Sequence, residues 1–122
     1  MNGMYDLHTH SILSDGEMLP IELIRRMAVT GYTTVAVTDH ADPSNAESLL
    51  ATIALVRESA DLFGVSLLCG IEITHVPPPQ IAPLAKTAKA RGADIVVVHG
   101  ETTVEPVAEG TNRAACGCKY VD

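Results

Sequence analysis

The sequence predicts an α/β fold built from parallel βα units. β-branched, apolar runs alternate with amphipathic stretches of helical spacing, and Gly or Pro residues mark the junctions. Residues that can bind a metal follow successive strand-like runs: His8, His10, Asp39, His40, Glu72 and His99. The intervals are 30 residues from His10 to His40, 32 from His40 to Glu72 and 27 from Glu72 to His99. A strand, loop and crossover helix also take roughly 30 residues. We therefore expect these residues to meet at the carboxyl edge of one sheet, where α/β folds build active sites.

The first part of the chain predicts two strands with a helix between them. Residues 4–8 form a short strand, and residues 33–38 form a β-branched strand that is apolar on both faces, as buried parallel strands are. A helix is predicted over 20–30, because apolar side chains recur there at helical spacing. Pro20 suits the first helical position, and Gly31 suits the position after the last turn.

One long helix is predicted over residues 45–63. Ser44 and Glu47 have the spacing of a capping box, and Gly64 follows the last apolar position. The strand-like run 65–73 comes next and contains Glu72 between two isoleucines.

Proline and glycine punctuate the second half of the chain. Three prolines at 77–79 predict a break, followed by a helix over 83–91 and a strongly apolar strand over 93–99. Beyond a loop, a short helix over 111–115 and the start of a fifth strand at 120–122 are predicted. The predicted strands number about half of those in a closed βα barrel. The last long strand would then lie near an open edge, and we expect that edge to promote self-association.

Length and composition predict one domain spanning residues 1–122. The chain is 47% hydrophobic, which is enough to build a core, and its net charge is −7. That charge argues against a general nucleic-acid-binding surface. The sequence shows no signal peptide and no apolar run long enough to span a membrane. Three cysteines are more typical of a reducing cytoplasm than of a disulfide scaffold, so a cytoplasmic location is predicted.

His8 and His10 form the first candidate metal site. Side chains alternate along a strand, so two histidines separated by one residue point to the same side and can reach one ion. Imidazole suits Zn, Fe, Ni or Cu, and carboxylates extend the choice to Mn and Mg. Taken alone, the pair is also compatible with two surface histidines near a loop.

Three further candidate ligands follow the later strands. His40 is the preferred ligand after the second strand, with Asp39 either orienting a histidine ring as an acceptor or belonging to a turn. Glu72 lies in an apolar strand, where a carboxylate is costly unless it is paired or metal-bound; otherwise it would face an exposed strand edge. His99 ends a run of valines and is either a ligand or a hydrogen-bonded core residue.

Four loop residues complete the candidates. Asp15 lies on the loop after the first strand, where it would either reach the same edge and bind a further ion or form a plain turn with Gly16. His75 is a candidate catalytic residue that would face a substrate phosphate. Asp39 is the other candidate catalytic residue, because it could orient a histidine ring. Glu101 and Arg113 are candidate substrate-binding residues. The alternative for His75, Glu101 and Arg113 is a solvated loop side chain.

Together these residues match a known family. Asp6-Leu7-His8-Thr9-His10-Ser11, followed by Ser14-Asp15-Gly16, resembles the first signature of the PHP superfamily, the polymerase and histidinol phosphatase domains. Thr38-Asp39-His40 is similar to the second signature, Gly70-Ile71-Glu72 to the third, and Val98-His99-Gly100-Glu101 to the fourth. The order and the intervals also agree. The stretches around Glu72 and His99 resemble the stand-alone, histidinol-phosphatase-like members.

The resemblance implies about half of a distorted seven-stranded βα barrel with up to three divalent ions (Zn, Mn, Fe or Mg) at its carboxyl end. It implies that His8, His10 and Glu72 hold one ion. Glu72 would bridge to a second ion, which His99 also binds, while Asp15 and His40 would hold the third.

The resemblance also implies a metal-dependent phosphoesterase. Its substrate would be a small phosphorylated molecule, either a phosphomonoester such as histidinol phosphate or a small phosphodiester. The family continues with a His-Pro and an Asp-x-His strand end, and the chain stops before both, so we expect impaired turnover. The alternatives are a non-catalytic metal- or phosphate-binding fragment and a self-associating half-barrel.

Overall fold

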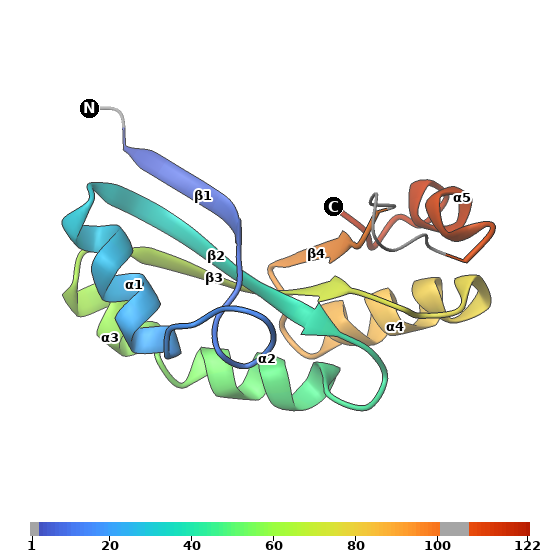
Figure 1. Cartoon of the computed structure of the whole chain (residues 1–122), viewed down its shortest axis with the longest axis horizontal. Helices are drawn as coiled ribbons and strands as arrows, with labels where there is room; N and C mark the ends of the chain where they lie inside the picture. The colour runs from blue at the N-terminus through green and yellow to red at the C-terminus, as the bar shows by residue number, and fades with distance from the viewer. Residues whose placement is uncertain (1–2, 101–107) are drawn as a thin grey trace.

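The computed structural model describes residues 3–100 and 108–122 and contains one four-stranded parallel sheet (Figure 1). The strand order follows the sequence: β1 (Met4–Thr9), β2 (Tyr32–Ala41), β3 (Ser66–Ile73) and β4 (Ile95–Val98). The helices are α1 (Pro20–Val29), α2 (Ala46–Ala54), α3 (Arg57–Leu62), α4 (Pro78–Ala90) and α5 (Thr111–Cys116). Helices α1 to α4 lie on one side of the curled sheet, so the predicted half-barrel of parallel βα units is confirmed (Figure 1).

Two apolar clusters fill the space between the sheet and these helices. One joins α1 and α3 to the first parts of β2 and β3, and fully buried Ile24 is one of its members. The other joins α2 and α4 to the later part of β3 and to β4, around Ile71 and Ile81, which are also fully buried. The hydrophobic effect thus fixes one face of β2, β3 and β4 against the helices and leaves the other face free for polar side chains.

The strand register brings the predicted ligands to one edge. His40 on β2 pairs with Glu72 on β3, and Glu72 pairs with Val97 on β4. His99 lies two residues beyond Val97, where its backbone N–H donates to Ile73 O at 2.8 Å. Because side chains alternate along strands, these positions share the face opposite the helices.

The predicted single helix over 45–63 is wrong, because two helices occupy that stretch. The last turn of α2 tightens at Leu55 and Val56, whose N–H groups reach back three residues instead of four. Arg57 then opens α3 and donates to Asp94 Oδ2 at 3.2 Å, a long-range contact that helical periodicity does not report.

The capping box predicted at Ser44 is also absent. The residue at the N-cap of α2 is Asn45, and it makes no side-chain capping hydrogen bond. The Ser44 hydroxyl instead donates to the carboxylate of Asp42. The Ser44 hydroxyl is therefore used in a local turn and does not cap the helix.

The predicted break at the three prolines is wrong as well, because α4 begins at Pro78. Its N-cap is Pro77, and Pro78 and Pro79 occupy the first turn, where backbone N–H groups have no partner within the helix. Pro83 lies inside the helix rather than at its start. The prediction placed the beginning of this helix five residues too late.

The final residues run along β4 without forming the predicted fifth strand. The Asp122 N–H donates to Val96 O at 2.8 Å, and Asp122 Oδ2 accepts from Val96 N at 2.7 Å and from Lys89 Nζ at 2.6 Å. One pairing position on the outer edge of β4 is thus occupied. Self-association through that edge stays a prediction.

We expect the Asp122 contact to stabilise the fold only above acidic pH. Burial acts to raise the pKa of this carboxyl, but Lys89 and the Val96 N–H outweigh burial and hold the pKa below its ordinary value of 3.8. A carboxyl with a depressed folded-state pKa adds stability above its unfolded pKa and loses it as the pH falls through the folded value. Asp122→Asn should therefore lower Tm at neutral pH, and the difference from the unaltered chain should shrink below about pH 4. Thermal melts across pH measure this, with exposed Asp61→Asn as control; a difference independent of pH would contradict it.

Candidate metal centre

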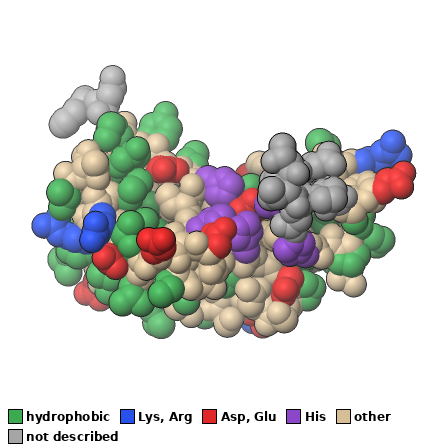
Figure 2. Space-filling model, viewed as in Figure 1, with side chains coloured by type: hydrophobic (Ala, Val, Ile, Leu, Met, Phe, Trp, Pro, Cys, Tyr) green, Lys and Arg blue, Asp and Glu red, His purple; other side chains and the backbone are tan. Residues whose placement is uncertain are grey.

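Histidine and acidic side chains gather at the centre of the face shown in Figure 2. They come from the carboxyl ends of all four strands and from the loop after β1. The intervals along the sequence predicted this convergence for His8, His10, His40, Glu72 and His99. Asp15, for which the sequence left a ligand and a turn residue both open, joins them.

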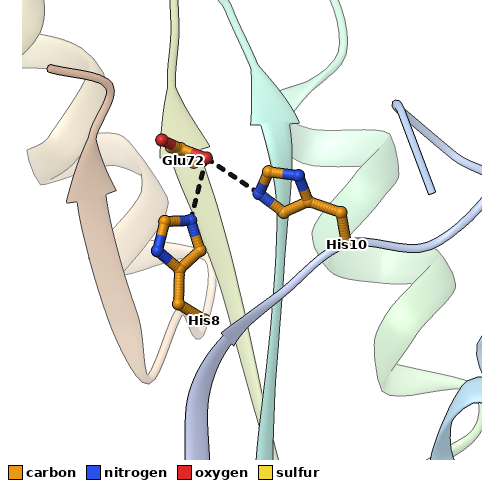
Figure 3. A group of neighbouring side chains, drawn as sticks. All are labelled: His8, His10 and Glu72. Atoms are coloured by element: carbon orange, nitrogen blue, oxygen red, sulfur yellow. Dashed lines mark hydrogen bonds and ion pairs between the residues drawn. The ribbon is translucent and has the colours of Figure 1, made fainter. Parts of the chain in front are cut away.

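Glu72 lies at the middle of the cluster and is only 5% exposed. Its Oε1 is 2.9 Å from His8 Nε2 and 2.8 Å from His10 Nε2, so both rings point at one oxygen (Figure 3). Its Oε2 is 3.3 Å from His99 Nδ1, and Oε1 is 3.6 Å from His40 Nδ1. Four imidazoles from three other segments therefore surround one carboxylate.

Glu72 is ionised in this environment. Burial acts to raise the pKa of Glu72, but the hydrogen bond from His8 and the charges of the neighbouring histidines outweigh burial and hold the pKa below its usual value. The buried carboxylate thus carries a full negative charge among neutral or cationic rings, which is the charge state that a divalent cation prefers.

Asp15 reaches the same edge from the loop after β1. Its Oδ1 is 2.6 Å from His10 Nδ1, and its Oδ2 is 3.0 Å from His40 Nε2. The pKa of Asp15 is lowered as well, because these two histidines outweigh the opposing effect of burial. The loop closes tightly: a Cβ on Gly16 would lie 2.3 Å from the His10 carbonyl oxygen, so only glycine fits there.

Asp39 is buried beside this loop and holds it in place. Its carboxylate accepts from Ser11 N at 2.7 Å, from Ser11 Oγ at 2.8 Å and from Ser14 Oγ at 2.6 Å. These three donors belong to the loop after β1. Asp39 thus anchors the segment that carries Asp15, and its support of a histidine ring stays a prediction.

The donor atoms form three overlapping groups, each with its ligand atoms within 4.8 Å of one another. They are His8–His10–Glu72, His10–Asp15–His40 and His40–Glu72–His99. Each group contains the residues that the resemblance implies for one ion, but His10 is added to Asp15 and His40, and His40 is added to Glu72 and His99. His10, His40 and Glu72 therefore each belong to two groups.

Unsatisfied nitrogen atoms show that this donor set fits metal ions. His10 Nε2 and His99 Nε2 are buried and have no hydrogen-bond partner within residues 3–100 and 108–122, which is costly for polar atoms. His10 Nε2 is close to Glu72 Oε1 without the alignment of a hydrogen bond. Buried imidazole nitrogens left without a hydrogen bond beside carboxylate oxygens suit a divalent cation.

The candidate catalytic residue His75 and the candidate substrate-binding residue Arg113 do not belong to the three donor groups. The His75 side chain is exposed near the cluster, with its ring centroid 6.4 Å from that of His99. Its φ of 61° is unusual for a residue other than glycine. Arg113 is exposed on α5, and within the described part of the chain no ion pair joins it to the carboxylates of the cluster. Glu101 lies outside the described residues.

Sequence reasoning missed the residues that hold the ligands. Ser11 and Ser14 bind Asp39, and the Thr74 hydroxyl is 2.6 Å from His40 Nδ1. Ser11 and Ser14 lie inside the first motif, and this position was the only feature of the sequence that could have pointed to their role. No feature of the sequence pointed to Thr74, because many polar residues can follow a strand.

Comparison with known proteins agrees with this geometry. The PHP domain family matches residues 6–109. An uncharacterized protein of Methanocaldococcus jannaschii is 46% identical over 120 residues, covering 97% of this chain and 55% of that protein. A 5'-3' exoribonuclease of Haemophilus influenzae is 35% identical over 74 residues, which is 61% of this chain and 24% of the enzyme. The 5'-3' exoribonuclease Rnm of Escherichia coli is 36% identical over 75 residues, which is 60% of this chain and 23% of that enzyme.

The chain spans about half or less of the length of these curated relatives. No solved structure gives a significant match. The match to the family covers most of the chain and includes every residue of the three metal-capable groups. The chain therefore belongs to the PHP domain family.

Proposed function

We propose that the cluster binds divalent metal ions and hydrolyses a phosphate ester. The observation that carries this proposal is the sharing of one buried, ionised carboxylate, Glu72, by two of the three donor groups. His8, His10 and Glu72 would hold one ion, Glu72 and His99 a second, and Asp15 and His40 a third. Such ions activate water and offset the charge of phosphoryl oxygens. Zn, Mn, Fe and Mg all suit these ligands.

The chain's own residues would orient and support this chemistry. Asp39 holds the loop that carries Asp15, and His75 at the exposed rim would contact a substrate phosphate. Among the helices formed by residues 3–100 and 108–122, none has the length and hydropathy of a transmembrane span.

The substrate belongs to one of two kinds of phosphate ester. The resemblance to histidinol-phosphatase-like proteins favours a small phosphomonoester. Two relatives are named 5'-3' exoribonucleases, which favours the phosphodiester of an RNA strand. With a net charge of −7, this chain would hold RNA at the metal site rather than on a broad basic surface.

Metal content and turnover, measured on the same sample, test the proposal. The chain is stripped with a chelator, reloaded with Mn²⁺ or Zn²⁺, and assayed on an aryl phosphate, histidinol phosphate and a 5'-phosphorylated RNA oligonucleotide. We expect hydrolysis that depends on the added ion. Bound metal without turnover would favour a non-catalytic binding role, and absence of bound metal would refute the metal centre.

A further inference from the structure

The Thr74 hydroxyl lies between the end of β3 and the ring of His40. Its oxygen is 3.0 Å from the Glu72 carbonyl oxygen and 2.6 Å from His40 Nδ1. Thr74 is only 8% exposed, and its backbone N–H donates to Ala41 O at 3.0 Å. The hydroxyl is therefore fixed in a buried position next to a proposed metal ligand.

The number of protons fixes the direction of both hydrogen bonds. A threonine hydroxyl carries one proton and two lone pairs, and a backbone carbonyl can only accept. The hydroxyl proton must point at the Glu72 carbonyl, so a lone pair faces His40 Nδ1. His40 Nδ1 must then carry a proton and donate it, which leaves Nε2 to donate when the ring is cationic or to offer a lone pair when the ring is neutral.

His40 Nε2 faces the Asp15 carboxylate. The distance from Nε2 to Asp15 Oδ2 is 3.0 Å. A proton on Nε2 can bridge these atoms as a hydrogen bond, and a metal ion that displaces this proton would be attracted by both atoms. The alternative partner of the ring, Glu72 Oε1, lies 3.6 Å from Nδ1, which is beyond hydrogen-bond range.

We propose that Thr74 is a positioning residue that holds His40 in the Nδ1–H tautomer and thereby assigns its Nε2 to the ion of the His10–Asp15 group. His40 then does not serve the neighbouring group with Glu72 and His99, since its Nδ1 is occupied. The assignment of an ion rests on the proposed function, but the tautomer follows from the hydrogen bonds alone.

The tautomer is measured directly in the metal-free chain. Two-bond ¹H–¹⁵N correlations distinguish protonated from unprotonated imidazole nitrogens. We expect a proton on His40 Nδ1 in the unaltered chain and in Thr74→Ser, which keeps the hydroxyl. Thr74→Val has nearly the same shape and no hydroxyl, so Nδ1 should lose its proton while Nε2 keeps one and donates to Asp15. Finding Nδ1 unprotonated in the unaltered chain would overturn the proposal without any variant.

Metal titration tests the assignment of His40. With Zn²⁺ and a competing chelator, Thr74→Val should weaken one ion by about 10–100-fold, as loss of a hydrogen-bond partner behind a ligand does. The ion of the His8–His10–Glu72 group should be unchanged, and Thr87→Val, an exposed threonine on α4, should alter nothing. An unchanged affinity in Thr74→Val would overturn the assignment. If the unaltered chain binds no Zn²⁺, the proposed function fails, while the tautomer measurement still decides the role of Thr74.

Discussion

Glu72→Gln is expected to remove two ions from the chain at once. Glu72 belongs to two of the three donor groups, and its two oxygens together face His8, His10, His40 and His99. Glutamine has nearly the same shape but is neutral, and its amide nitrogen cannot bind a cation. Loss of a partner behind a ligand costs about 10–100-fold in metal affinity, so loss of a shared ligand should exceed that range.

Metal content per chain and Zn²⁺ titration measure this effect. Glu58→Gln is the matched control, because it removes the same charge from an exposed position on α3. His40→Ala provides a second comparison, since it should lower only the occupancy of the group that contains Asp15. Full metal stoichiometry in Glu72→Gln would rule out the bridging role.

Asp39→Ala is expected to destabilise the fold and to weaken the third ion. The Asp39 carboxylate is 1% exposed and accepts hydrogen bonds from Ser11 N, Ser11 Oγ and Ser14 Oγ. Each buried polar group left without a partner costs about 1–3 kcal/mol, so the free energy of unfolding should fall by roughly 2–4 kcal/mol. The loop also carries Asp15, so metal affinity at the His10–Asp15–His40 group should fall with it.

Urea denaturation and metal titration separate the two consequences. Ser14→Ala removes one of the three donors and should have a smaller effect on both quantities. Asp61→Ala removes an exposed carboxylate from α3 and should change neither. An Asp39→Ala chain with an unchanged urea midpoint would show that the loop does not need this anchor.

The four strands and the convergence of His8, His10, His40, Glu72 and His99 could be predicted from the sequence because both follow from spacing. A parallel βα unit has a nearly fixed length, so residues such as His40 and Glu72 that end successive strands arrive at one edge. Their register, with His40 directly beside Glu72, is a consequence of the same repeat.

The helix boundaries and the supporting contacts could not be predicted, because they depend on partners distant in sequence. The break before Arg57 accompanies its contact with Asp94, and the early start of α4 depends on prolines that are tolerated in a first turn. The role of Asp39 was interpreted from its neighbour His40, whereas the structure gives it partners in the loop after β1.

The order of the strands has a consequence for how the chain folds. Each strand pairs with the next one in sequence, so the sheet can grow one βα unit at a time. The donor groups become complete in the same order: His10 with His40 once β2 has docked, Glu72 with β3 and His99 only with β4. An ion that binds complete groups therefore favours the fully assembled sheet over chains in which β4 is still detached. Divalent ions in the folding medium should raise the yield of the complete sheet.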